Sequence, residues 1–279
     1  MIGYAREVQV GLVGETMTRK KDNLASFGFA FPAGSPHVSR TMMLAELTLL
    51  LDYVQDPAAS RADYIQAIVE DNCLNKRTER NRLISKRYLL ELYALDHELL
   101  LFRALLFYWR RDPAGRPLLA LLCAYARDSL LRASSRYILP LPAGAAVTRE
   151  STEEFLDSLA PGRYSPGKLA SNAKNINSTW TQSGHLRGRT NKKRSHPTTT
   201  SGPLAYALLL AYLTGVRGSS LFHGEYVKLL DCSFDRAVAL AQEASQRGWL
   251  VCKRVGDVIE VLFPNLINEQ EMGWLREQG

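Results

Sequence analysis

Apolar residues recur every three to four positions through most of the first half of the chain, which is the pattern of amphipathic helices. The pairs Asp56-Pro57 and Asp112-Pro113 mark turns, and Ser60 with Asp63 has the spacing of a capping box. The pattern predicts five helices, at 39–55, 60–72, 75–95, 98–111 and 117–136. Helices with such short connections are typical of an all-α bundle. Residues 1–38 show no clear period, so no elements are predicted there.

The clearest helix pattern lies in the second half of the chain. Ser165 is a favourable N-cap, Pro166 suits the first helical position, and Gly184 is suited to end the helix. One apolar stripe recurs between them at helical spacing: Leu169, Ala173, Ile176 and Trp180. The opposite face carries hydrogen-bonding side chains and no carboxylate: Lys168, Ser171, Lys174, Asn175, Ser178 and Gln182.

A shorter helix and a tight turn come before this long helix. Ser151 with Glu154 predicts a capping box, and Pro161-Gly162 ends the short helix. The order of short helix, turn and long helix is that of a helix-turn-helix, whose second helix enters the major groove of DNA. We expect the turn-rich segment after Gly184 to form a wing that bends at Thr190-Asn191.

The last third of the chain predicts a second helix followed by a hairpin. The apolar run at 203–214 predicts a buried helix, and Ser233 can cap another. Gly256-Asp257 is typical of the two-residue turn of a β-hairpin. Because the capped helix carries Asp235 and Glu243, we expect it to have a structural or partner-docking role and not to read DNA.

These patterns together predict a mainly α protein of two domains. With 279 residues, 46% hydrophobic and 23% charged, the chain is long enough for two cores. The Pro- and Ala-rich connector at 138–147 is the candidate boundary. We expect an N-terminal helical bundle over 1–145 and a winged-helix-like domain with short β-hairpins over 146–279. Within the second domain, 146–200 would hold the basic helix and wing, and 201–279 the C-terminal helix and hairpin.

Positive charge is concentrated in one segment. Between Ser158 and Gly224 there are nine Lys and Arg residues and no Asp or Glu. The whole chain has 35 basic and 28 acidic residues, so the remainder holds 26 and 28 and is close to neutral. An excess of charge confined to one helix and wing indicates a polyanionic partner, although a solvated basic loop would have the same composition.

The candidate DNA-binding residues follow from this charge and from the predicted helix faces. Those expected to contact phosphates are Lys168, Lys174, Arg187, Arg189, Lys192, Lys193 and Arg194. Those expected to face base edges are Ser171, Asn175, Ser178 and Gln182. Further phosphate contacts are expected from the basic start of the 75–95 helix, if it shares one surface with the wing: Lys76, Arg77, Arg80 and Arg82.

Several other classes of protein fit the sequence poorly. The first thirty residues have no uninterrupted apolar core, so we expect a cytoplasmic protein without a signal peptide. The apolar runs at 99–109 and 203–213 are about half the length of roughly 20 residues that a transmembrane helix needs, which argues against a membrane partner. The four cysteines lack the spacing of a zinc site and are interpreted as reduced core residues.

No catalytic arrangement is found in the sequence. The five histidines are dispersed, and GLVGET near the start lacks the Lys and Ser or Thr of a phosphate-binding loop. Without carboxylates, the basic segment lacks the ligands of a two-metal nuclease. We therefore expect no enzymatic activity, no cofactor and no catalytic metal.

Three segments together resemble the BrxA family, an accessory component of bacterial BREX phage-defence systems. They are AIVEDNCLNKRTERNRLISKRYLLELY at 67–93, ALLFYWRRDP at 104–113 and SPGKLASNAKNINSTWTQSGHLRG at 165–188. The resemblance covers most of 39–224 in the same order and includes no catalytic signature. It implies a small helical protein with winged-helix character that binds DNA and acts beside the other BREX components, a methyltransferase and an ATPase among them.

Two alternatives to duplex DNA binding remain open. A protein-interaction scaffold within the defence complex would use the helical bundle and the C-terminal hairpin, without direct DNA contact. RNA binding is less favoured, because residues 163–197 have only Tyr164 and Trp180 as aromatic residues for stacking, and Trp180 lies on the apolar stripe.

Overall fold

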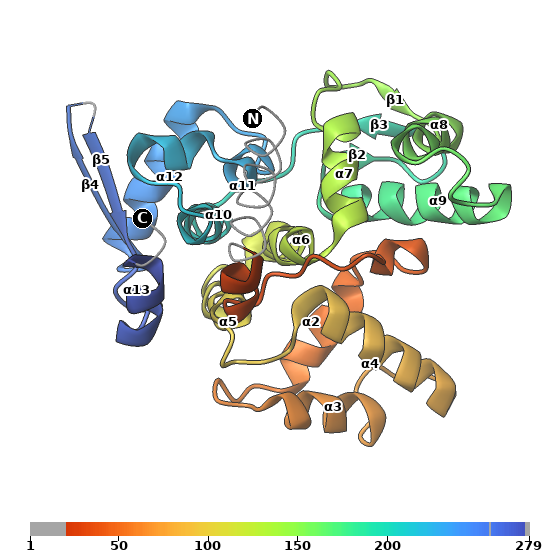
Figure 1. Cartoon of the computed structure of the whole chain (residues 1–279), viewed down its shortest axis with the longest axis horizontal. Coiled ribbons are helices and arrows are strands. Elements are labelled where there is room, and N and C mark those ends of the chain that lie inside the picture. The colour runs from red at the N-terminus through yellow and green to blue at the C-terminus, as the bar shows by residue number, and fades with distance from the viewer. Residues whose placement is uncertain (1–20, 257, 277–279) are drawn as a thin grey trace, which may run out of the picture.

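The computed structural model describes residues 21–256 and 258–276. The protein is mainly helical and has two small antiparallel sheets, which confirms the mainly α prediction. Residues 1–20, which include the GLVGET motif, lie outside the described residues. In Figure 1 the three-stranded sheet and the helices around it lie on one side, and the two-stranded hairpin lies on the opposite side.

Most of the helices predicted in the first half are found. The elements are η1 (Pro36–Val38), α2 (Leu44–Tyr53), α3 (Arg61–Val69), α4 (Glu79–Tyr93), α5 (Leu100–Arg111), η2 (Pro113–Gly115), α6 (Arg116–Arg127) and α7 (Ser129–Ile138). Ser60 and Asp63 form the predicted capping box at the start of α3.

Three of the predicted helices differ from the observed ones. The helix expected at 117–136 is wrong: Asp128 is extended there, and its carboxylate accepts from the backbone N–H groups of Leu130 and Leu131, so it ends α6 and caps α7. The helix expected from 39 begins only at Leu44, after Met43 in a left-handed conformation. The helix expected from 75 begins at Glu79, with Thr78 as its N-cap.

Residues 146–194, which include most of the basic residues of the charged segment, form two helices and a small three-stranded sheet. The elements are β1 (Ala146–Val147), α8 (Arg149–Leu159), α9 (Pro166–Gln182), β2 (Leu186–Arg187) and β3 (Lys192–Arg194). β3 is the central strand, antiparallel to β1 and to β2. Because β1 brings the chain straight into α8, the N-cap is Thr148 and not Ser151; the Ser151 hydroxyl accepts from the Thr148 backbone N–H instead.

The C-terminal third matches its sequence pattern closely. It contains α10 (Ser201–Leu213), η3 (Gly218–His223), α11 (Glu225–Lys228), α12 (Phe234–Gln246), β4 (Val251–Val255), β5 (Val258–Leu262) and α13 (Glu269–Arg276). Ser233 caps α12 as predicted, and β4 and β5 pair as the expected hairpin. The short elements η3 and α11 and the helix α13 have no counterpart among the predicted elements.

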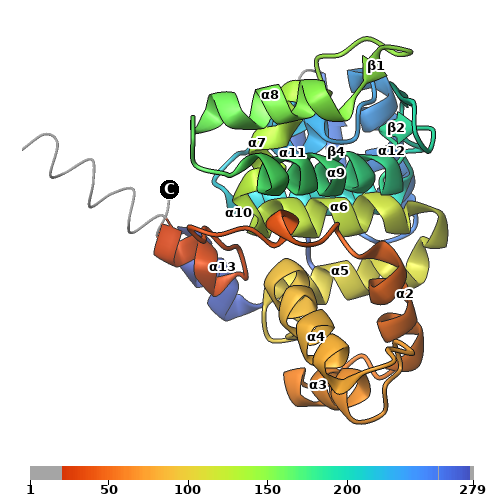
Figure 2. The same cartoon turned by 90° about the vertical axis from the view of Figure 1, so that its right-hand side faces the viewer.

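α10 is the central helix of the core. Every residue from Ser201 to Ala211 is buried, and the helix packs against α5, α6, α11 and α12 (Figures 1 and 2). Its contacts therefore join the helices on both sides of residue 145 into one hydrophobic core. The division into domains at that residue stays a prediction. Among residues 21–256 and 258–276, no helix has both the length and the apolar character that crossing a bilayer would require.

Candidate nucleic-acid interface

α9 is fixed to the protein by its predicted apolar stripe. Ala173, Ile176 and Trp180 are fully buried. The Trp180 indole Nε1 donates to the Ser134 hydroxyl of α7 at 2.9 Å. Gly184 has a φ of +88°, the left-handed conformation expected of a residue that ends a helix. The start and the end of α9 are thus confirmed; Ser165 occupies the N-cap position, although its hydroxyl makes no capping bond.

A second face of α9 is covered by residues 35–44, which we call the strap. The Asn175 side-chain amide donates to the His37 carbonyl at 3.1 Å. Further along, the Gln182 side-chain carbonyl accepts from the Leu44 backbone N–H at 3.3 Å. Figure 2 shows the strap passing between α9 and α4. Asn175 and Gln182, both predicted to face bases, each use one end of the side-chain amide to hold the strap.

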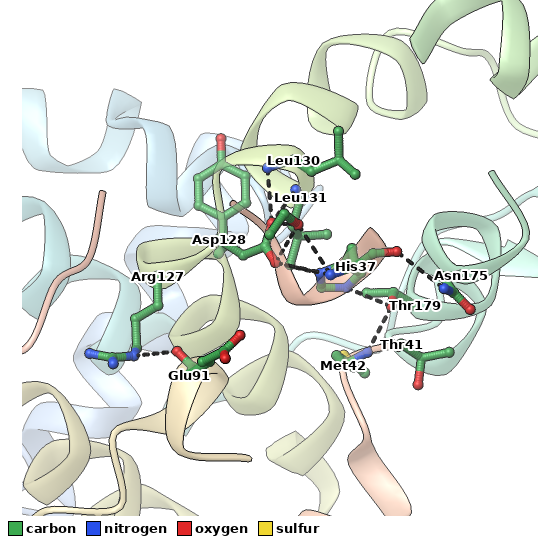
Figure 3. Close-up of polar contacts among 12 residues, drawn as sticks. His37, Thr41, Met42, Glu91, Arg127, Asp128, Leu130, Leu131, Asn175 and Thr179 are labelled. Carbon is green, nitrogen blue, oxygen red and sulfur yellow. Dashed lines mark hydrogen bonds and ion pairs between the residues drawn. The ribbon is translucent and has the colours of Figure 1, made fainter. Parts of the chain in front are cut away.

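A buried hydrogen-bond chain anchors the strap between α7 and α9 (Figure 3). His37 Nδ1 lies 2.8 Å from the Asp128 carboxylate, and His37 Nε2 lies 2.9 Å from the Thr179 hydroxyl. The same hydroxyl accepts from the Met42 backbone N–H at 2.9 Å. In this chain the His37 ring connects the Asp128 carboxylate, through Nδ1, to the Thr179 hydroxyl, through Nε2.

This chain has the order of an acid–base–hydroxyl triad, but it is a structural feature. His37, Asp128 and Thr179 have no exposed surface, so a substrate cannot reach the hydroxyl. Burial opposes ionisation of Asp128, yet the charge of His37 and hydrogen bonds from His37, Leu131 and Ser35 lower the pKa of Asp128. Sequence reasoning missed the chain because its members are 91 and 142 positions apart, with no local spacing to reveal them.

The remaining face of α9 is exposed and polar. Lys168, Ser171 and Lys174 are exposed, and Ser178 is half-buried. Thr181 lies one further turn along the same stripe as Lys174 and Ser178, and it was not among the predicted residues. Its hydroxyl accepts from the Lys192 ammonium of β3 at 2.8 Å, so this hydrogen bond joins the exposed stripe of α9 to the wing. Burial lowers the pKa of Lys192.

The wing is formed by β2, β3 and the turn between them. Arg187, Arg189 and Lys193 are exposed. Gly188 permits the turn, because it has a φ of +107° and a Cβ at this position would lie 2.3 Å from the Asn191 carbonyl oxygen. Among the described residues, no carboxylate pairs with the exposed cations of α9 and the wing, which are Lys168, Lys174, Arg187, Arg189 and Lys193.

Arg194 does not belong to this set, and the prediction that it contacts phosphate is corrected. Its side chain is almost fully buried at the base of the wing, where it pairs with Asp231 at 2.7 Å. Its guanidinium also donates to the backbone carbonyls of Ile138, His185 and Ser195. With its donors occupied away from solvent, Arg194 holds the wing to α7 and to the segment before α12.

The four basic residues predicted near the start of α4 are not brought to α9. Lys76 pairs with Glu46 of α2 at 3.0 Å, and Arg82 donates to the Val69 carbonyl at 2.6 Å. Arg77 and Arg80 are exposed. The part of α4 that reaches the strap is its other end, where the Tyr93 hydroxyl donates to the Met42 carbonyl. At about 1.5 Å of rise per residue, roughly 20 Å of helix separates the two ends.

The described residues hold no group of three His, Cys, Asp or Glu side chains arranged to bind a metal ion. Comparison of the chain with protein-family models, with curated proteins and with solved structures finds no match. The functional assignment therefore depends on the geometry and charge of α9, the wing and the strap.

Proposed function

We propose that the protein binds duplex DNA through α9 and the wing, as a non-enzymatic accessory protein of a BREX-type bacterial phage-defence system. The observation that carries the proposal is the exposed surface of α9 and the wing. It combines an uncharged polar stripe with five cations that no described carboxylate pairs with. Lys and Arg neutralise phosphates, whereas Ser and Thr hydroxyls can bond base edges.

The order of the elements supports the same proposal. The chain runs α7, β1, α8, α9, β2, β3, and the sheet order is β1-β3-β2. We interpret this order as that of a winged-helix domain, in which α9 would be the recognition helix and the β2–β3 turn the wing. Two hydrogen bonds fix α8 against α9: Thr152 donates to the Asn177 side-chain carbonyl at 3.0 Å, and the Asn177 amide donates to the Thr148 carbonyl at 3.3 Å.

The test is a fluorescence-anisotropy titration of a labelled duplex with the wild type and with the triple variant Arg187→Glu, Arg189→Glu, Lys193→Glu. These three side chains are exposed, so the variant leaves the buried Arg194–Asp231 pair intact. Reversing three phosphate contacts should weaken binding by at least about a hundredfold at near-physiological salt. The matched control is Lys253→Glu with Arg254→Glu, two exposed cations of the second hairpin. Equal affinity of the wild type and the triple variant would refute the assignment of the wing.

One observation favours a second candidate function, that of a protein-interaction scaffold. Val255 and Val258 pair with each other at the tip of the β4–β5 hairpin. They are 80% and 72% exposed, which is unusual for two apolar side chains that lie side by side. A scaffold that used this tip would form complexes that survive high salt, whereas DNA binding weakens steeply as salt rises. A pull-down with the other defence components at high salt, with Val255→Ser and Val258→Ser as the variant, distinguishes the two.

A further inference from the structure

The strap carries an arginine beside α4, in addition to its contacts with α9. Arg40 is half-buried, and its guanidinium carbon lies 5.5 Å from the ring centre of Tyr88 in α4. Arg87, one residue earlier in α4, approaches the same ring to 4.4 Å. Two arginine side chains therefore lie at one aromatic ring. Neither the helical pattern of the sequence nor its charge distribution predicts this contact.

The charges at this place are only partly compensated. Arg87 lies 3.7 Å from Glu91 in an exposed pair, whereas the Arg40 guanidinium donates to the carbonyl of Ser39. Within the described residues, no carboxylate pairs with Arg40. The cation–π contacts favour this arrangement, and repulsion between the two guanidiniums offsets part of that gain. An anion bound between them would remove that repulsion.

The strap holds Arg40 close to the exposed stripe of α9. On one side of Arg40, His37 accepts from Asn175; on the other side, Met42 donates to Thr179. Both partners are on α9, and Asn175 directly follows the exposed Lys174. The strap therefore lies between α9, whose exposed face carries Lys174, and α4, which carries Arg87 (Figure 2).

We propose that Arg40 and Arg87 form a second phosphate-binding point, which holds the backbone of the same duplex beyond the stretch contacted by α9 and the wing. We call this pair the clasp. The inference rests on the proposed function and adds to it a longer DNA footprint and an N-terminal contact. Phosphate suits the clasp because planar guanidiniums bind phosphate oxygens through paired hydrogen bonds.

The experiment compares two duplex lengths, one of about 10 base pairs and one of about 20, or roughly one and two helical turns. The clasp variant is Arg40→Glu with Arg87→Glu. The chain offers a matched control in Arg217→Glu with Arg247→Glu, because Arg217 also lies over a tyrosine ring, that of Tyr212, and Arg247 also pairs with a glutamate four residues away. Arg217 directly precedes η3, which packs against β5, and Arg247 directly follows α12. In Figure 1, β5 and α12 lie on the opposite side of the molecule from α9.

The clasp variant should bind the 20-base-pair duplex at least about tenfold more weakly than the wild type, and the salt slope should fall by about 2. On the 10-base-pair duplex the loss should stay within about threefold, and the control variant should match the wild type on both. Circular dichroism checks the fold of each variant, and Arg40→Gln with Arg87→Gln provides a milder version of the change.

Three results would overturn the inference. Wild-type affinity of the clasp variant for both duplexes would show that Arg40 and Arg87 contact no phosphate, and the proposed function would stand without the clasp. An equal loss on both lengths would show that the pair lies within the primary site or acts through the fold. If the wild type bound neither duplex, the proposed function itself would fall, and the clasp with it.

Discussion

Two units of this protein have the same local plan, a helix followed by an antiparallel hairpin, and present different chemistry. α9 and the β2–β3 wing expose cations and hydroxyls, and no carboxylate occurs in the sequence between Ser158 and Gly224. α12 exposes Asp235 and pairs Glu243 with Arg247, while the β4–β5 hairpin ends in exposed valines. In our proposal the helix-and-hairpin plan does not by itself indicate DNA binding, and the charge on the exposed surface is the difference that assigns it to α9 and the wing.

The two hairpins are also attached to the protein in different ways. In β5, Ile259 and Val261 are buried and alternate with exposed residues, as in a strand packed on a helix. The wing strands are shorter: β2 buries Leu186, and β3 pairs with β1 and ends at Arg194, which forms the buried pair with Asp231. The second hairpin is therefore stabilised by apolar burial, and the wing by a buried ion pair that leaves its exposed residues free to be basic.

The largest expected effect on stability comes from this ion pair. Arg194→Ala leaves Asp231 without the guanidinium and removes the side-chain donor from three backbone carbonyls, so unfolding should become easier by about 3–5 kcal/mol. The matched change in the other hairpin, Arg254→Ala, removes an exposed side chain and should stay within about 0.5 kcal/mol. Urea unfolding of both variants gives the two values. A cost below about 1 kcal/mol for Arg194→Ala would contradict the difference in attachment.

The next effect is a loss of stability in acid that arises at the base of the wing. His185 is buried against Trp180, and its Nε2 donates to the Leu229 carbonyl at 2.9 Å. Burial lowers the pKa of His185 to about 4, so between pH 6.5 and 4 the unfolded chain binds a proton that the folded protein does not. Stability from this residue is complete above pH 6.5 and falls by up to about 3 kcal/mol as the pH drops to 4.

Chemical unfolding at several pH values tests this prediction. His185→Gln keeps a side-chain donor and removes the titrating group, so the difference in unfolding free energy between the wild type and this variant isolates the residue. The difference should shrink as the pH falls from 6.5 to 4. A constant difference across that range would show that His185 does not destabilise the fold in acid.

The smallest expected effect distinguishes base reading from backbone contact on α9. Ser171→Ala with Ser178→Ala removes two hydroxyls of the exposed stripe and should lower the preference for a selected duplex over a random one by about 1 kcal/mol. Lys168→Ala with Lys174→Ala should weaken binding to both duplexes equally, because phosphate contacts do not depend on sequence. Competition titrations give both preferences. If the serine variant kept the full preference, the stripe would not read bases.

Much of the fold could be predicted because its determinants are local. The α9 helix, the Ser60 capping box and the β4–β5 turn each depend on residues within a few positions of one another. The break at Asp128 could have been recognised only by knowing that this carboxylate would cap α7 and not lie on the surface of a continuous helix.

The part of the site that could not be predicted depends on distant contacts. Asn175 and Gln182 have the composition of a reading face, but the strap, more than 130 positions earlier, occupies one end of each amide. Arg194 looks like its exposed neighbour Lys193, but Asp231, 37 positions later, pairs with it in the interior. Charge and helical period predict where the candidate DNA-binding surface lies. Tertiary contacts determine which of its side chains are free to contact DNA.

The most direct test of the central claim is the salt dependence of duplex binding, plotted as log K against log salt concentration. On a duplex of about 10 base pairs, too short to reach the clasp, the five exposed cations of α9 and the wing should give the wild type a slope of about −4 to −5. The wing variant Arg187→Glu, Arg189→Glu, Lys193→Glu should reduce its magnitude by about 3, and Lys253→Glu with Arg254→Glu in the second hairpin should leave it unchanged. A slope near zero for the wild type, or an equal change for the two hairpins, would contradict the assignment of DNA binding to α9 and the wing.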